Sequence, residues 1–217
     1  MSKSKISVKN GNVSLGKGCK IHRTAILGMA SPRKKSAGRL GIGRGAIVRS
    51  GAVIYGNTTI GDGLETGHNA VIREENKIGD NFNIWNNSVI DYGCTIGNNV
   101  KVHSNVYVAQ YTALEDGVFL APGVTIANDP HPGCSFSKKC MRGPTIKKGA
   151  RIGVNSTILP FVVIGKNCLV GAGSVVTKNI PAGSVAYGNP ARVCGKVSEL
   201  VCDKGITDRP YPDRGNK

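Results

Sequence analysis

A repeat with a period of six residues dominates the middle of the chain. Between residues 42 and 126 every sixth residue is aliphatic, with the single exception of Thr66. The series consists of Ile42, Val48, Ile54, Ile60, Thr66, Ile72, Ile78, Ile84, Ile90, Ile96, Val102, Val108, Leu114, Leu120 and Ile126. Neither an α-helix nor a flat strand repeats every six residues, whereas a hexapeptide period is typical of a parallel β-helix. We therefore predict triangular coils of three hexapeptides, with these residues, called rungs below, stacked inside a prism.

Short residues occupy the position two before many rungs, where a coil would turn a corner. They are Ala46, Ala52, Thr58, Ala70, Ser88, Cys94 and Thr112. Cys19 and Cys168 fill the same position in other repeats, so we expect these thiols and that of Cys94 to be buried. The total of seven cysteines is odd, which argues against a complete disulfide framework and favours a reducing compartment.

Length and composition fit a single solenoid better than a globular α/β core. The chain has 217 residues, 30 glycines and only 5% aromatic residues, as expected for a fold dense in turns. It contains no apolar run long enough to span a membrane and no recognisable signal sequence. We therefore expect a soluble cytoplasmic protein without a membrane span.

The chain is strongly basic, with a formal net charge of +16. Such a charge can serve solubility alone, or it can attract polyanions such as nucleic acid, a coenzyme or a sugar nucleotide. Few aromatic residues are interleaved with the basic ones, and no nucleic-acid-binding motif is present. We therefore expect small phosphorylated ligands and no nucleic acid.

The six-residue count fails twice, and both failures predict loops that leave the prism. The first, residues 29–40, contains Lys34 and Lys35 and is either a solvated insertion or a basic flap near a phosphate. The second, residues 127–145, is rich in proline and glycine and is too long to be a simple turn. We expect a β-helix over residues 1–185 with these two loops, followed by a capping tail over residues 186–217.

Polar residues also interrupt the regular ladder at outward or corner positions. We expect most of them to be solvated, although some outward faces would form a seam if prisms associate. They are Glu65, His68, Arg73, Glu74, Glu75, Trp85, Asn86, Asn87, His103 and Asn105.

Three segments carry a resemblance to a known family. They are VFLAPGVTIANDPHP (118–132), IGVNSTILPFVVIGKNCLVGAGSVVTKNIPAG (152–183) and YGNPARV (187–193). With them the chain resembles the left-handed β-helix, hexapeptide-repeat acyltransferases, in particular the galactoside- and maltose-type acetyltransferases and the sugar-nucleotide N-acetyltransferases. The resemblance implies an all-β, left-handed parallel β-helix, a homotrimer with active sites at subunit seams, and acetyl-CoA as cosubstrate. The acceptor would be a sugar or amino-sugar, with a nucleotide-linked amino-sugar favoured, and its identity and O- or N-acetylation stay open.

In the galactoside-like branch a loop histidine is the base, and His131 matches its place. An imidazole can accept a proton near neutral pH, so we predict His131 as general base, with Asn128 or Asp129 orienting it or holding the acceptor. The loop departs from the Thr-Gly-His-Pro usual in that branch, and some sugar-nucleotide N-acetyltransferases use no histidine. His68 and His103 therefore stay open as alternative bases.

The resemblance also implies a site for coenzyme A. Small residues would let the pantetheine arm reach the main chain, and basic residues would lie near the phosphates. The matching residues are Val154, Gly171, Ala172, Gly173, Thr177, Lys178 and Arg192. The glycines could equally be ordinary corner residues.

Parts of the sequence also suit other functions. The spacing of His131, Cys134 and Cys140 could hold zinc, but a fourth ligand is not evident. A γ-type carbonic anhydrase shares the fold and holds zinc at its seam, but the chain lacks that family's His-x4-His pair, and His68 and His103 are 35 positions apart rather than 36. A non-enzymatic scaffold is disfavoured by the loop that carries His131. We therefore predict an acyltransferase and no metal site.

Overall fold

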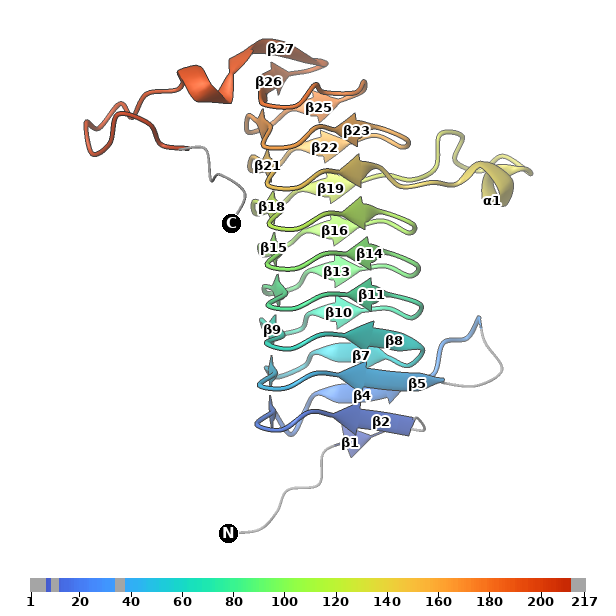
Figure 1. The fold of residues 1–217 in the computed structure, drawn as a ribbon. Coiled ribbons are helices and arrows are strands. Elements are labelled where there is room, and N and C mark those ends of the chain that lie inside the picture. Colours follow the sequence, from blue (N-terminus) through green and yellow to red (C-terminus); the bar gives the residue numbers. More distant parts are fainter. Residues whose placement is uncertain (1–6, 9–11, 34–37, 212–217) are drawn as a thin grey trace.

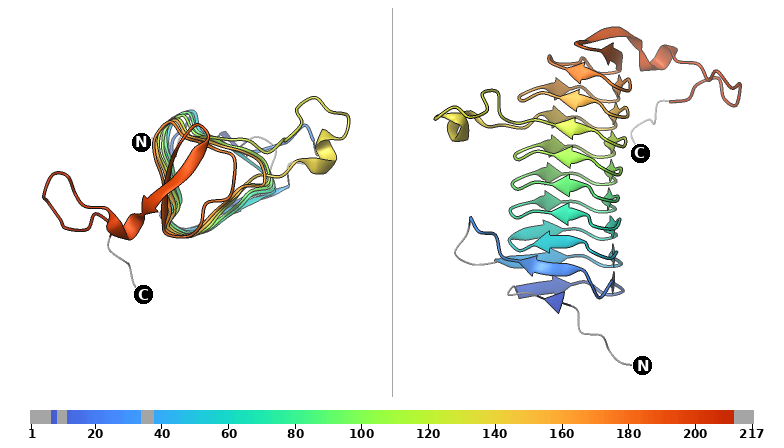
Figure 2. Two further views of the ribbon diagram at one scale, coloured as in Figure 1. Left: turned by 90° about the horizontal axis from the view of Figure 1, so that it is seen from above. Right: turned by 180° about the vertical axis from the view of Figure 1, so that it is seen from behind.

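The chain winds into a prism of stacked triangular coils (Figures 1 and 2). The computed structural model describes residues 7–8, 12–33 and 38–211. In this part of the chain three sheets form the walls of the prism, and up to Val176 successive parallel strands fall on sheet 1, sheet 2 and sheet 3 in turn. Strands separated by one full coil pair in register, so Ile72 lies between Ile54 and Ile90. The predicted parallel β-helix is therefore confirmed.

Each sheet is a row of strands stacked along the prism. From the N-terminal end, sheet 1 contains β1 (Ser7–Val8), β4 (Ile26–Met29), β7 (Val53–Tyr55), β10 (Val71–Ile72), β13 (Val89–Ile90), β16 (Tyr107–Val108), β19 (Thr125–Ile126), β22 (Thr157–Ile158) and β25 (Val175–Val176). Sheet 2 contains β2 (Asn12–Leu15), β5 (Arg39–Ile42), β8 (Thr58–Ile60), β11 (Lys77–Ile78), β14 (Thr95–Ile96), β17 (Ala113–Leu114), β20 (Thr145–Ile146) and β23 (Val163–Ile164). From the C-terminal end, sheet 3 contains β27 (Ala191–Lys196), β26 (Ser184–Gly188), β24 (Leu169–Val170), β21 (Arg151–Ile152), β18 (Phe119–Leu120), β15 (Lys101–Val102), β12 (Asn83–Ile84), β9 (Glu65–Thr66), β6 (Ile47–Val48) and β3 (Lys20–Ile21).

The core is the stack of rungs inside the prism. Every residue of the six-residue series is buried, including the polar exception Thr66. The Thr66 hydroxyl accepts a hydrogen bond of 3.0 Å from the main-chain N–H of Arg49 in the coil below. Thr66 thus provides an acceptor for a main-chain N–H that would otherwise be left without a hydrogen-bond partner. Of the three cysteines predicted to be buried, Cys94 and Cys168 are buried and Cys19 is only partly so.

Both predicted loops leave the prism at the same edge, where sheet 1 passes into sheet 2, called the 1–2 edge below. The first excursion joins β4 to β5, and the second joins β19 to β20 and contains the short helix α1 (Ser137–Cys140). Figure 1 shows both excursions projecting to the same side of the stack. Lys34 and Lys35 of the predicted basic flap lie outside the described residues. A second corner of the triangle, where sheet 3 passes into sheet 1, is called the 3–1 edge.

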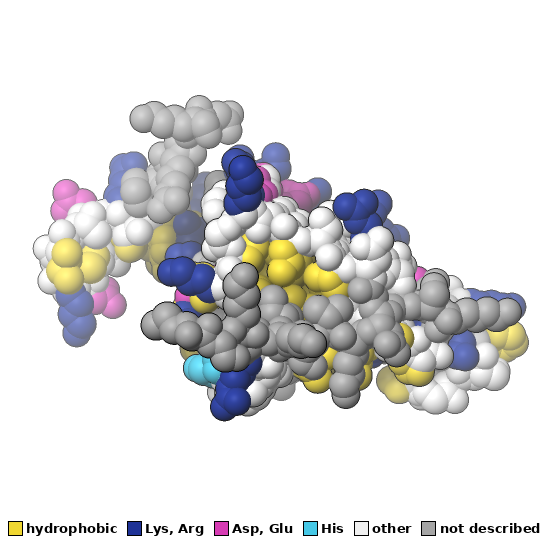
Figure 3. Space-filling model, turned by 90° about the horizontal axis from the view of Figure 1, so that it is seen from below, with side chains coloured by type: hydrophobic (Ala, Val, Ile, Leu, Met, Phe, Trp, Pro, Cys, Tyr) yellow, Lys and Arg dark blue, Asp and Glu magenta, His cyan; other side chains and the backbone are white. Residues whose placement is uncertain are grey.

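The two ends of the prism differ. At the C-terminal end β26 pairs with β24 and then forms an antiparallel hairpin with β27, which crosses the end of the prism in Figure 2. The 3₁₀ turn η1 (Val197–Glu199) follows, and the chain then extends outward before the Tyr211 ring returns beneath Arg151, 4.5 Å from its guanidinium carbon. At the N-terminal end Val13, Leu15 and Ile21 are only partly buried, and Figure 3 shows hydrophobic side chains gathered there.

Candidate active site at the second excursion

Asn128 fixes the start of the second excursion to the ladder. Its side chain is buried, and its Nδ2 donates a hydrogen bond of 2.6 Å to Oε1 of Gln110, one coil below. Its main-chain carbonyl accepts a hydrogen bond of 2.7 Å from the N–H of Arg142, near the other end of the excursion. These two contacts hold the two ends of the loop together at the 1–2 edge.

Asp129 shapes the main chain around His131. Its Oδ1 accepts the main-chain N–H of His131 at 2.9 Å, and its Oδ2 accepts the hydroxyl of Ser137 at the start of α1. The hydrogen bond from Ser137, and to a lesser extent that from the His131 N–H, lower the pKa of the Asp129 carboxyl. In this structure Asp129 therefore positions the loop backbone, and it makes no hydrogen bond to the imidazole of His131. The ring of His131 is exposed and makes no hydrogen bond with any residue that the structure describes.

The ladder histidines lie elsewhere on the prism. His68 is at the 3–1 edge, where its Nδ1 is 2.6 Å from the hydroxyl oxygen of Ser50. His103 packs at the same edge against Phe119, with ring centroids 4.8 Å apart. Burial, and then the charge of Lys101, lower the pKa of His103. Within one chain neither histidine lies on the edge that carries the second excursion.

Four residues predicted to bind coenzyme A share the 3–1 edge. Val154 lies one coil below Ala172, and the N–H of Gly173 donates a hydrogen bond of 2.8 Å to the Val154 carbonyl. The side chain of Val154 is 43% exposed, and Ala172 is exposed beside it. A Cβ on Gly171 would lie 2.8 Å from Cβ of Tyr187, so packing alone requires glycine there. This edge therefore offers an exposed strip of small and apolar residues.

The remaining predicted coenzyme A residues lie on other parts of the surface. Thr177 and Lys178 follow β25 at the 1–2 edge, the edge that also carries Asn128. Arg192 lies in β27 beyond the last coil, exposed, with NH1 3.1 Å from the carbonyl of Ala191. One prism thus does not bring all the predicted residues into one cleft, because they are divided between two of its edges and its C-terminal hairpin.

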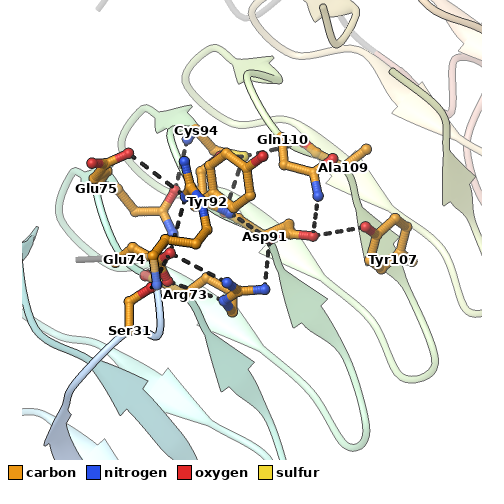
Figure 4. Close-up of polar contacts among 12 residues, drawn as sticks. Ser31, Arg73, Glu74, Glu75, Asp91, Tyr92, Cys94, Tyr107, Ala109 and Gln110 are labelled. Atoms are coloured by element: carbon orange, nitrogen blue, oxygen red, sulfur yellow. Dashed lines mark hydrogen bonds and ion pairs between the residues drawn. The ribbon is translucent and has the colours of Figure 1, made fainter. Parts of the chain in front are cut away.

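A buried polar network at the 1–2 edge was missed in the sequence. Glu74, expected to be solvated, is only 1% exposed, because Ser31 of the first excursion covers it and donates a hydrogen bond of 2.7 Å to its Oε1. Arg73 links Glu74 to Asp91, with Nε 3.0 Å from Glu74 Oε2 and NH1 3.3 Å from Asp91 Oδ1 (Figure 4). The available signal was the opposite charge of Arg73 and Asp91 at a spacing of 18 residues, which is one coil.

The network continues from Asp91 towards the second excursion. Asp91 Oδ2 accepts hydrogen bonds of 2.8 Å from the Tyr107 hydroxyl and 2.5 Å from Gln110 Nε2. Burial, and then the contact with the carboxylate, raise the pKa of Tyr107, which therefore stays protonated and donates. Gln110 in turn contacts Asn128, so a continuous polar chain joins the two excursions along the prism.

The described part of the chain contains no grouping of metal ligands. Among the described residues no three or more His, Cys, Asp or Glu side chains are placed to hold a metal ion together. Cys134 and Cys140, the candidate zinc ligands of the loop, are free thiols. The described residues also include no helix with the length and apolarity needed to cross a bilayer.

These features define a parallel β-helix protein of the hexapeptide-repeat class. The family model for bacterial transferase hexapeptide (six repeats) matches residues 77–110, 93–128 and 143–178 of this chain. Over its length the fold is similar to that of an Arabidopsis UDP-N-acetylglucosamine acyltransferase, with a TM-score of 0.71 and 20% identity over 93% of this chain and 73% of that one. The fold is thus a left-handed parallel β-helix, as the resemblance implied.

Two curated relatives match shorter parts of the chain. A dTDP-3-amino-3,6-dideoxy-alpha-D-galactopyranose 3-N-acetyltransferase of Aneurinibacillus thermoaerophilus is 54% identical over 56 residues, covering 26% of this chain and 29% of the relative. A galactoside O-acetyltransferase of Lactococcus lactis is 38% identical over 90 residues, covering 38% of this chain and 42% of the relative. Each match therefore spans less than half of the relative's own length.

Proposed function

We propose that the protein is an acetyl-CoA-dependent acetyltransferase that acts on a sugar or amino-sugar, with a nucleotide-linked amino-sugar as the favoured acceptor. The observation that carries the proposal is the exposed His131 imidazole, held on an excursion whose two ends are pinned by Asn128. An excursion of this kind from a rigid solenoid presents a reactive side chain without disturbing the core. The relatives that match the chain include acetyltransferases of an amino-sugar nucleotide and of a galactoside.

The 3–1 edge suits the pantetheine arm of acetyl-CoA. Val154 and Ala172 form an exposed apolar strip, and Gly173 beside them has no side chain that could block access to the main chain. Arg192 and Lys178 supply positive charge near the C-terminal end, where the phosphates of the coenzyme would lie. These residues would align the thioester, and alignment lowers the barrier to transfer.

The transfer would proceed by direct attack on the thioester. The acceptor nitrogen or oxygen forms a bond to the thioester carbonyl carbon, while the His131 imidazole removes the proton from that atom. The tetrahedral intermediate then collapses, the carbon–sulfur bond breaks, and the leaving sulfur takes the proton from the His131 imidazolium, so that the coenzyme leaves as a thiol and His131 is neutral again. General-base assistance of this kind contributes about 10²–10⁴ in rate.

We propose a homotrimer in which each active site lies between two prisms. His131 and Lys178 belong to the 1–2 edge, whereas Val154 and Ala172 belong to the 3–1 edge. When three prisms close in a ring, one edge of each faces a different edge of its neighbour, as in any head-to-tail assembly. Such a contact would bring the loop of one subunit to the apolar strip of the next.

The acceptor panel is the direct test. Thiol release from acetyl-CoA would be followed with dTDP-3-amino-3,6-dideoxygalactose, its 3-hydroxy counterpart, a free galactoside and serine. We expect turnover with a sugar acceptor, fastest with a nucleotide-linked one. Absence of release with every acceptor, together with CO2 hydration by protein carrying stoichiometric zinc, would overturn the proposal.

A further inference from the structure

We propose that Asp91, acting through Gln110 and Asn128, is a positioning residue that makes the acceptor site select an amino group. The inference rests on the proposed acetyl transfer and names the chemical class of its acceptor. It comes from the direction in which hydrogen bonds must run along three side chains that lie on successive coils of the 1–2 edge.

The Asp91 carboxylate sets this direction. It is only 5% exposed, and its Oδ1 faces NH1 of Arg73 at 3.3 Å, which leaves Oδ2 for Tyr107 and Gln110. Figure 4 shows Asp91 between these three side chains. A carboxylate can only accept hydrogen bonds, so the Gln110 amide must turn its Nε2 towards Asp91.

The direction then passes to the excursion. Because Nε2 of Gln110 donates to Asp91, its Oε1 faces Asn128 and can only accept a hydrogen bond. Asn128 must therefore donate through Nδ2, which lies 2.6 Å from Gln110 Oε1. The Asn128 side-chain oxygen Oδ1 is left, and no residue in the described part of the chain donates a hydrogen bond to it. This chain of hydrogen bonds from Asn128 through Gln110 to Asp91, called the relay below, therefore makes Asn128 a hydrogen-bond acceptor at the base of the loop that carries His131.

An amine fits a site of this polarity better than a hydroxyl does. A neutral primary amine has two N–H groups, so it can donate one to the Asn128 oxygen and lose the other to the base, while its lone pair attacks. A hydroxyl has a single proton, which the base must remove, and nothing is then left to donate to Asn128. The relay thus favours N-acetylation of an amino-sugar.

The test compares wild-type protein with Asp91→Asn. An asparagine at this position can donate to Gln110, so the relay can reverse and Asn128 can turn its NH2 group outwards. We expect kcat/KM for dTDP-3-amino-3,6-dideoxygalactose to fall about tenfold or more, the value of one hydrogen bond. The KM for acetyl-CoA should stay unchanged, because none of the residues proposed to bind the coenzyme belongs to the relay. The wild-type preference for the amine over the 3-hydroxy counterpart should shrink in the variant.

Tyr107→Phe is the matched control, because it removes one hydrogen bond to the same carboxylate oxygen but leaves the direction of the relay intact. Tyr107→Phe should retain activity within about threefold of wild type. In protein that already carries Asn128→Ala, adding Asp91→Asn should not lower kcat/KM further, because both changes act through Asn128. Equal effects of Asp91→Asn and Tyr107→Phe, additive effects with Asn128→Ala, or an unchanged amine preference would overturn the relay while leaving acetyl transfer standing. Absence of transfer by the wild-type protein would overturn both proposals. Melting curves would show whether each variant folds. If Asp91→Asn fails to fold, Gln110→Leu takes its place and is judged by the same criteria.

Discussion

The guanidinium carbon of Arg33 lies 3.4 Å from the centre of the Tyr92 ring, although the two residues belong to different parts of the chain. Arg33 comes from the first excursion and Tyr92 from a corner of the ladder, and NH1 of Arg33 also lies 3.0 Å from Oε1 of the buried Glu74. Stacking on an aromatic ring and pairing with a carboxylate are both favourable for a guanidinium group. The excursion is thereby folded back onto the prism, and Glu74 is the carboxylate that holds it.

Glu74 should make stability depend on acid pH. Hydrogen bonds from Arg73 and Ser31 outweigh the cost of burial and lower its pKa from 4.5 to about 2. A lowered pKa means that the contribution to stability is fully present above about pH 4.5 and is lost as the pH falls towards 2. Glu74→Gln should be less stable than wild type at neutral pH, by about 3 kcal/mol, and should show a flatter decline across this window.

Urea unfolding at a series of pH values measures this effect. Glu65→Gln is the matched control, because the ion pair of Glu65 with Arg49 is partly exposed, and such pairs contribute about 0–1 kcal/mol. Parallel pH profiles for wild type and Glu74→Gln would contradict the assignment.

Thr66→Val should destabilise the prism even though it makes the rung apolar. Valine has almost the same shape as threonine but cannot accept the Arg49 N–H, and a buried donor without a partner costs about 1–3 kcal/mol. Thr125→Val, at an exposed position of β19, should change stability by less than about 0.5 kcal/mol. Thermal unfolding of both variants gives the comparison. A stabilised Thr66→Val protein would show that the hydroxyl contributes nothing.

Arg192→Ala should weaken coenzyme binding without slowing the chemical step. Loss of one cation beside the phosphates should raise the KM for acetyl-CoA about three- to tenfold while kcat stays near the wild-type value. Arg23→Ala removes the same charge from an exposed position near the other end of the prism. Steady-state kinetics at low and moderate salt would distinguish the two. An equal rise in KM for both variants would mean that only the overall charge of the protein matters.

The period of six was sufficient to predict the coils and the rungs, because burial of one side chain per hexapeptide is a local property of the sequence. It also located both excursions, since an insertion shifts the phase of the repeat. It could not show that Ser31 would cover Glu74, because that contact depends on how the first excursion folds back over the corner. The side chain of Glu74 therefore looked like one more solvated carboxylate.

Much of the candidate site was beyond prediction for a related reason. The sequence placed His131 on a loop, but the link from Asp91 through Gln110 to Asn128 depends on residues from three coils meeting at one edge. The division of the predicted coenzyme A residues between two edges and the C-terminal hairpin follows from the count of strands per coil. Which edges of neighbouring prisms meet is a property of the assembly, and no single repeat encodes it.

The proposed acetyl transfer depends most directly on His131 as the general base. The most direct measurement is the rate of thiol release from saturating acetyl-CoA by wild-type protein and by His131→Ala, with His68→Ala and His103→Ala measured alongside. Because the His131 ring makes no hydrogen bond within the described chain, the substitution should leave the melting temperature and the KM for acetyl-CoA unchanged. We predict a fall in kcat of about 100-fold or more for His131→Ala alone. A His131→Ala protein that retains the wild-type rate, or a comparable loss in either of the other two variants, would contradict the account.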